Sequence, residues 1–118
     1  MTMPVRVIPK DTTPSVHTPV ADTAAIITLA AEHHVRHLVR TIVWSYSVAP
    51  TAGRLTLTVD GTIRLDVDIT AAGPGALPLD LLTAEQAAVV ITLAAGGAAV
   101  VGKLSVVSNP TSGSQWEQ

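Results

Sequence analysis

The stretch that decides the fold is Leu55 to Ile69, LTLTVDGTIRLDVDI, in which apolar and polar residues alternate on both sides of Asp60-Gly61. Alternation with a period of two is typical of a β-strand that buries one face, and Asp-Gly between two such runs is typical of a tight turn. The stretch therefore predicts an antiparallel β-hairpin with one face against a core.

The loop of this hairpin decides which side chains face the core. A two-residue loop, Asp60-Gly61, would place Arg64 on the same face as the leucines before the turn. A three-residue loop from 59 to 61, with its glycine left-handed, pairs Leu57 with Ile63 and separates the apolar face from the polar one, so we predict this loop. The expected inward residues are Leu55, Leu57, Ile63, Leu65, Val67 and Ile69, and the expected outward residues are Thr56, Thr58, Thr62, Arg64, Asp66 and Asp68.

Composition narrows the class of protein. The chain has 118 residues, a formal net charge of −2 and no cysteine. This predicts one domain with no disulfide, no basic surface for nucleic acid, and only Asp, Glu and His as metal-ligating side chains. The first ten residues, MTMPVRVIPK, hold no apolar leader, so we expect no signal peptide and a protein made and kept in the cytoplasm.

The predicted core consists of small side chains. The chain has no phenylalanine, and its aromatic residues are Trp44, Tyr46 and Trp116. Aromatic side chains supply much of the buried area in a domain of this size, so a lone monomer would be marginally stable and we expect an oligomer. Gln86 to Gly102 is uncharged and has the length of a short membrane helix, but its glycines and β-branched residues favour a hairpin.

The ends of the chain differ from the middle. Residues 1–22 carry a proline every five residues, which excludes helix and predicts an extended arm. It is either a flexible leader or an arm lying across a neighbouring subunit, and Val5 to Ile8 would suit a short edge strand. The expected organisation is an arm over 1–22, a β-sandwich over 23–108, and a flexible polar tail over 109–118, in which Trp116 is either exposed without a role or a small docking anchor.

The remaining segments predict further strands. Strands are expected over 24–31 and 35–48, joined by a turn at 32–34, with a bulge near Arg40 where the alternation changes phase. An edge strand is expected over 76–82, because Pro78 lacks an amide proton, and a turn of helix over 83–86. Residues 87–107 predict a second hairpin that turns at Gly96-Gly97 and pairs Leu93 with Val100. Seven or eight short strands predict an all-β antiparallel β-sandwich of jelly-roll type, with an immunoglobulin-like sandwich as the alternative.

Candidate sites are few. Glu32, His33, His34 and His37 form the one cluster of metal-ligating residue types; on strands His33 and His37 would share a face and His34 would point away. The histidine pattern of a cupin enzyme is absent, so a solvated turn is favoured over a metal site, and pH-dependent assembly through these histidines is a further alternative.

Two aspartates stand on the polar face of the first hairpin. Asp66 and Asp68 lie two residues apart beside Arg64, which suits either a calcium ion or, as the favoured interpretation, a solvated face with weak cross-strand ion pairs. Asp60 belongs to the turn, and Asp80 is expected in a loop without a partner. The glycines of Gly73-Pro74-Gly75 predict a turn and not a phosphate site. We predict no catalytic, cofactor or metal residues, and hence no enzyme.

Three segments of the sequence resemble a known class of proteins. AAIITLAAEHHVRHLVRTIVWSYS, PTAGRLTLTVDGTIRLDVDITAAGPG and AAVVITLAAGGAAVVGKLSVV, within residues 24 to 107, resemble small virion structural proteins of tailed bacteriophages, of the capsid decoration or cement type. The resemblance implies a β-sandwich or jelly-roll homotrimer that binds the major capsid protein and stabilises the capsid exterior, located on the virion surface, with neither nucleic acid nor membrane as partner. The alternatives are a receptor- or glycan-binding module of a tail fibre or spike, and a bacterial β-protein outside any virion.

Overall fold

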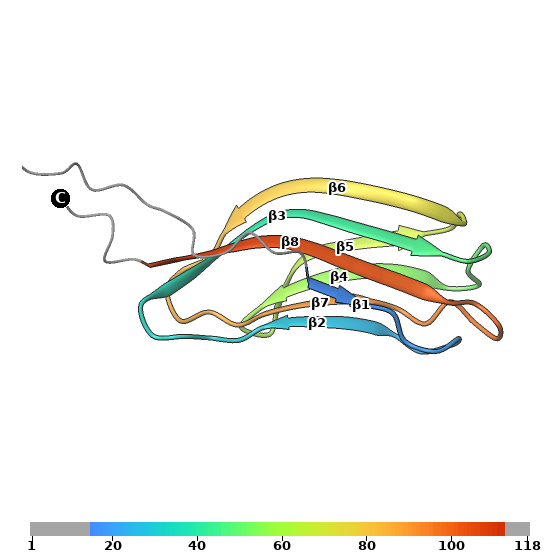
Figure 1. Cartoon of the computed structure of the whole chain (residues 1–118), viewed down its shortest axis with the longest axis horizontal. Coiled ribbons are helices and arrows are strands. Elements are labelled where there is room, and N and C mark those ends of the chain that lie inside the picture. The colour runs from blue at the N-terminus through green and yellow to red at the C-terminus, as the bar shows by residue number, and fades with distance from the viewer. Residues whose placement is uncertain (1–14, 113–118) are drawn as a thin grey trace, which may run out of the picture.

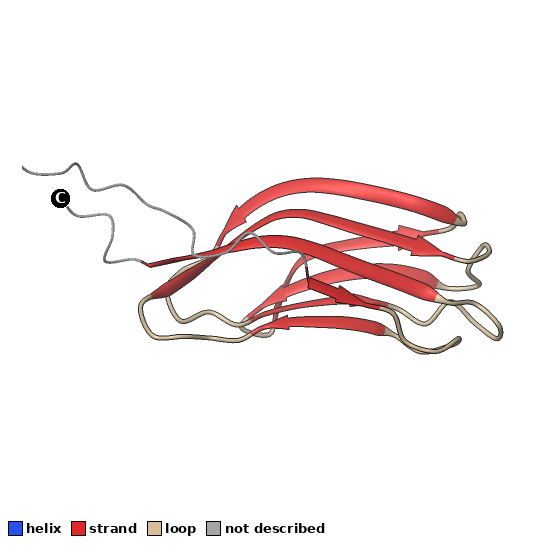
Figure 2. Cartoon of the chain, viewed as in Figure 1, coloured by secondary structure: helices blue, strands red, loops and turns tan. Residues whose placement is uncertain are grey.

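The structure is a computed structural model and describes residues 15–112, which form eight β-strands and no helix (Figures 1 and 2). No helix in this range is therefore long and apolar enough to cross a membrane. The strands are β1 (Ser15–His17), β2 (Ala25–Leu29), β3 (Val35–Tyr46), β4 (Gly53–Val59), β5 (Thr62–Ile69), β6 (Gly73–Leu82), β7 (Val89–Leu93) and β8 (Gly102–Ser112).

The strands form two four-stranded antiparallel sheets, one in the order β1-β8-β3-β6 and the other in the order β2-β7-β4-β5 (Figure 1). The pairs β1 with β8, β2 with β7, β3 with β6, and β4 with β5 are those of one long hairpin folded over on itself, with its tip at Asp60-Gly61. This connectivity is a jelly roll, which confirms the predicted antiparallel sandwich. The stretch from Leu55 to Ile69 is thus the tip around which the other strands pair.

The core fills the space between the two sheets. Leu55, Leu57, Ile91 and Leu104 are fully buried there, and Tyr46 is the largest fully buried side chain. Trp44, Leu65, Val67 and other half-buried side chains pack against this cluster. Each sheet therefore buries one face, as the alternation of apolar and polar residues predicted.

The loop of the tip hairpin is shorter than predicted. Val59 pairs with Thr62 across a two-residue loop, and both loop residues have positive φ, 49° at Asp60 and 83° at Gly61, as a type I′ turn requires. The register then shifts, because Thr58 faces Ile63 whereas Leu57 faces Leu65. Arg64 is the extra residue of this bulge, which realigns the two faces after the turn.

Because of the bulge, one side chain that was predicted to face the core faces outward instead. Ile63 was expected in the core, but it is 53% exposed, since it lies opposite the outward residue Thr58. Leu55, Leu57 and Ile69 are buried as predicted. The three-residue loop is therefore wrong, although it assigned most of both faces correctly.

Replacing Gly61 with valine should lower the free energy of unfolding by about 1 kcal/mol or more, because a β-branched residue strains the left-handed conformation. A side chain added there meets nothing within 4 Å, so backbone strain and not a clash would cause the loss. Chemical denaturation measures the effect. Gly61→Asn is the matched control, since asparagine tolerates this conformation; equal losses for the two variants would contradict a left-handed Gly61.

The predicted bulge near Arg40 is confirmed, because the pairing of β3 with both neighbours shifts register between Val39 and Thr41. The predicted edge strand is confirmed as well, since β6 lies at the end of its sheet. It is longer than expected, however, and Gly73 to Gly75 begins this strand where a turn was predicted. The helical turn predicted over 83–86 is also wrong, because these residues are not helical.

The predicted hairpin over 87–107 is wrong, since β7 and β8 lie in different sheets and the chain crosses from one to the other through residues 94–101. The reason is that β7 is already paired on both sides, with β2 and β4, and has no free edge. The crossing is held by Tyr46, whose hydroxyl donates to the Ala94 carbonyl at 2.7 Å.

The sandwich extends beyond the expected limits of 23 and 108. β1 belongs to the first sheet, where Ser15 pairs with Val106, and β8 continues to Ser112. His17 of β1 also joins the sheets, because its Nδ1 accepts the Ile26 amide proton at 2.9 Å. The predictions for Val5 to Ile8 and for Trp116 lie outside the described residues.

Candidate binding site

A group of polar side chains lies on the outer side of the second sheet, next to the exposed Ile26 of β2, and we call this group the polar face. Pairing places Thr92 of β7, Thr56 of β4 and Asp66 of β5 side by side in one row across three strands. The next positions of β4 and β5 add Arg54 opposite Asp68. The polar face is the set Arg54, Thr56, Thr58, Asp66, Asp68 and Thr92.

Four members of the polar face were predicted outward from the sequence: Thr56, Thr58, Asp66 and Asp68. Both threonines are half-buried and both aspartates exposed. Arg54 continues the same alternation two residues before Thr56, so the pattern also predicts that Arg54 faces outward. No local signal joins Thr92 to the face, because its place depends on the pairing of β4 with β7.

An ion pair orders the centre of the polar face. Arg54 donates from Nε to Asp66 Oδ1 at 2.7 Å and from Nη2 to Oδ2 at 2.6 Å, which is a bidentate arrangement across β4 and β5. These hydrogen bonds hold the pKa of Asp66 below its usual range and raise that of Arg54. The cross-strand pairing predicted for this face is therefore present, with Arg54 and not Arg64 as the cation.

Replacing Arg54 with glutamine should raise the pKa of Asp66 towards the usual aspartate value of about 4, because the cation that favours the carboxylate is lost. In the unchanged protein this pair stabilises the fold above that usual value, and its contribution is lost as the pH falls through the lowered folded-state pKa. A carboxyl NMR titration measures the shift. Lys103→Gln removes a positive charge from the other sheet and serves as the control; an Asp66 titration unchanged by R54Q would contradict the pairing.

The polar face lacks an aromatic platform in the described part of the chain. Tyr46 is buried. The Trp44 ring lies over Gly75, where an added Cβ would stand 2.5 Å from Cζ2. Any ligand of this surface would be held by hydroxyl, carboxylate and guanidinium groups, which bond to other hydroxyls and amides.

The predicted histidine geometry is wrong. His33 and His34 lie together in the turn with ring centroids 3.8 Å apart, and their Nδ1 atoms lie 3.1 Å from Gln86 Oε1 and 3.3 Å from Glu85 Oε1 respectively. His37 instead points inward and is buried, with Nε2 donating to the Ala30 carbonyl at 2.8 Å. No three His, Asp or Glu residues within the described range gather as a metal site would require.

The other two aspartates have structural partners. Asp80 was expected in a loop, but it lies in β6, and its Oδ1 is 3.4 Å from Arg40 Nε. Asp60 is bound at the tip, where its Oδ1 accepts the Ala88 amide proton at 2.9 Å. Neither carboxylate belongs to the polar face.

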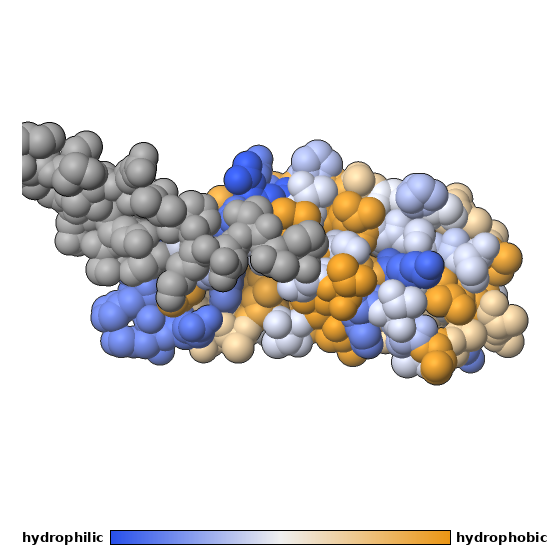
Figure 3. Space-filling view, in the orientation of Figure 1, coloured by the Kyte–Doolittle hydropathy of each residue, from blue (hydrophilic) through white to orange (hydrophobic). Residues whose placement is uncertain are grey.

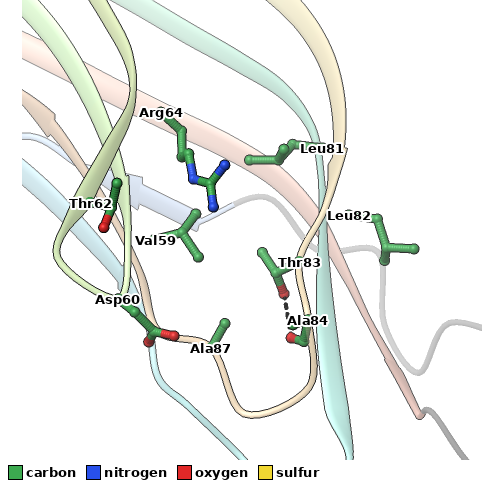
Figure 4. Close-up of a pocket in the computed structure, with 9 residues that line it drawn as sticks. All are labelled: Val59, Asp60, Thr62, Arg64, Leu81, Leu82, Thr83, Ala84 and Ala87. Carbon is green, nitrogen blue, oxygen red and sulfur yellow. Dashed lines mark hydrogen bonds between the residues drawn. The ribbon is translucent and has the colours of Figure 1, made fainter.

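A cavity of about 280 Å³ opens beside the tip hairpin, between the end of β6 and the start of β5 (Figure 4). Both strands are edges of their sheets. Val59 and Leu81 line its wall, and the guanidinium of Arg64 points into it. Sequence reasoning had placed Arg64 on the polar face, and the bulge moves it away to this opening.

No protein-family model and no curated protein matches the sequence. Among solved structures, a CBM36-1 domain of a multidomain xylanase from the hindgut metagenome of Trinervitermes trinervoides is similar at 6% identity and a TM-score of 0.47, covering 82% of this chain and 96% of that one. A family 35 carbohydrate binding module from an environmental isolate has 16% identity and a TM-score of 0.43, with 79% and 73% covered. Carbohydrate-binding module CBM36 in complex with calcium and xylotriose has 14% identity and a TM-score of 0.38, with 90% and 93% covered. Likeness this distant assigns no ligand to this chain.

Proposed function

We propose that this chain is a non-catalytic recognition module that binds glycans on the polar face. The observation that carries the proposal is the row of Thr92, Thr56 and Asp66, which pairing aligns across three strands. Threonine hydroxyls and a carboxylate held by Arg54 offer donors and acceptors at fixed spacing, and neighbouring hydroxyls of a sugar chain present the complementary groups.

The setting we propose is the receptor- or glycan-binding module of a phage tail fibre or spike. Because no aromatic ring within residues 15–112 lies on the polar face, the described site relies on hydrogen bonds that replace bonds to water, and so binds weakly. A homotrimer, as the resemblance to virion structural proteins implies, would present several such sites to one polymer and gain avidity without new contacts.

Asp66→Asn tests the proposal. The variant is expected to bind glycan about tenfold more weakly, because it loses a charged acceptor and its bidentate cation. Binding of the unchanged protein is first sought on an array of neutral and acidic glycans and then measured by calorimetry. Asp80→Asn is the matched control, since it removes a paired aspartate from the other sheet and should leave affinity unchanged. No binding to any glycan would reject the function.

A second candidate, capsid decoration, is favoured by a different surface. On the outer side of the first sheet, Val16, Val43 and Leu82 are 65%, 36% and 44% exposed. Figure 3 shows apolar side chains scattered among polar ones on the face in view. Val16 and Val43 lie on either side of Ser105 in one row of the first sheet, and neighbouring exposed apolar groups suit contact with another protein, such as the major capsid protein.

Mixing the protein with expanded, undecorated capsids tests this candidate, and stoichiometric binding is its expected result. Val43→Lys should abolish that binding, because a charge would enter the contact, whereas Asp66→Asn on the opposite side should not affect it. Capsids that bind no protein would reject the decoration function. Mass spectrometry of purified virions would then separate a head, a tail and a non-virion location by presence and copy number.

A further inference from the structure

The cavity beside the tip hairpin holds a cation without a partner. Arg64 points its guanidinium between Val59, Leu81 and Thr83 (Figure 4), and it forms no ion pair or hydrogen bond with any residue of the described range. Arg40 and Arg54, in contrast, each face an aspartate. The side chain is therefore available to a ligand.

A specific backbone feature aims this side chain. The bulge leaves Arg64 without a pairing partner between Ile63, which faces outward, and Leu65, which packs against the core. Bulges commonly redirect a side chain beside a binding site, and here the redirection turns a cation towards the space between the two edge strands.

The surroundings of Arg64 select the kind of anion. Val59, Leu81 and Ala87 give apolar walls, and the hydroxyls of Thr62 and Thr83 add polar groups. Asp60 also lines the cavity, and its negative charge opposes a doubly charged phosphate more strongly than a singly charged carboxylate. A guanidinium matches a carboxylate through two parallel hydrogen bonds.

We propose that this cavity binds the carboxylate of an acidic sugar unit. The inference rests on the proposed glycan-binding function and names a second site, distinct from the polar face. The volume of about 280 Å³ lies just below the usual range of ligand pockets, which begins at about 300 Å³, and fits one small unit better than an extended chain. The carboxylate pairs with Arg64, and the apolar walls contact the sugar ring.

The test titrates the full chain with glucuronate and with glucose, which differ in having a carboxylate or a hydroxymethyl group. Glucuronate should give saturable NMR shifts at Val59, Thr62 and Thr83, and glucose should bind at least tenfold more weakly. Arg64→Gln should weaken glucuronate binding about tenfold or more, and Arg64→Lys by less, because lysine keeps the charge but not the paired hydrogen bonds. Lys103→Gln, which removes an exposed charge at the other end of the fold, should change nothing.

Several results would overturn the inference. Glucuronate that shifts no cavity resonance would do so, as would equal losses for R64Q and K103Q, since these indicate a general effect of charge. An R64Q variant that aggregates but binds normally would assign Arg64 to protection of an edge strand instead. If neutral oligosaccharides still bind the polar face in any of these cases, the proposed function stands and only the carboxylate site fails. An acidic peptide that binds the cavity in preference to glucuronate would point to a protein ligand and reject the sugar.

Discussion

Replacing Tyr46 with alanine is expected to lower the free energy of unfolding by about 3 to 5 kcal/mol, as truncation of a large buried aromatic side chain does. Tyr46 is 2% exposed, and its ring packs against the crossing between the sheets, where added side chains at Gly96 and Gly102 would touch it. Because small domains unfold at a cost of only about 5 to 15 kcal/mol, this loss would remove much of the stability. Denaturant unfolding followed by circular dichroism measures it.

Tyr46→Phe distinguishes the contribution of the hydroxyl to stability from that of the ring. It should cost about 1 kcal/mol, the usual value of one hydrogen bond, because the Ala94 carbonyl loses its donor while the packing stays. Burial also raises the pKa of Tyr46, so stability should fall as the pH rises beyond about 10, where the unfolded tyrosine ionises first. A Y46F variant that retains the whole of this alkaline loss, or one as unstable as Y46A, would contradict these roles.

Leu57→Ala should destabilise the protein by about 2 to 5 kcal/mol, since it empties part of a fully buried position in the core. Ile63→Ala is the matched control on the paired strand and should change stability by about 1 kcal/mol or less, because about half of that side chain is in solvent and it lies outside the core. Both are measured by the same denaturant unfolding.

The comparison of these two variants decides the register of the tip hairpin. A three-residue loop would pair Leu57 with Ile63 in the core, and the two truncations would then cost similar amounts. The bulge at Arg64 instead pairs Leu57 with Leu65. Comparable losses for L57A and I63A would therefore contradict the structure of the tip, and with it the position of Arg64 in the cavity.

Much of the polar face was predictable, and the cavity was not. Thr56 and Asp66 follow from the period of two in their own strands, which needs no knowledge of the rest of the fold. Arg64 obeys the same period in the sequence and yet leaves the face, because a bulge changes the phase without any glycine or proline to mark it. The bulge at Arg40 was predictable, since there the apolar residues themselves change phase.

The prediction of a second hairpin over 87–107 failed for a different reason. Gly96-Gly97 between two apolar runs is a strong local turn signal, and the pairing of Leu93 with Val100 satisfied it. Local signals do not show that β2 and β4 already occupy both edges of β7. The choice between a hairpin and a crossing between sheets depends on contacts between distant parts of the chain.

The sequence by itself determined that this chain forms antiparallel strands around a core of small side chains, because the alternation along Leu55 to Ile69 allows only one face to be buried. It also determined the turn at Asp60-Gly61 as the end of a hairpin. Only the tertiary structure decided how that hairpin extends into a jelly roll, where Thr92 joins Thr56, and where Arg64 points. These features depend on pairing between strands far apart in the chain, and such pairing leaves no periodic signal within a single strand.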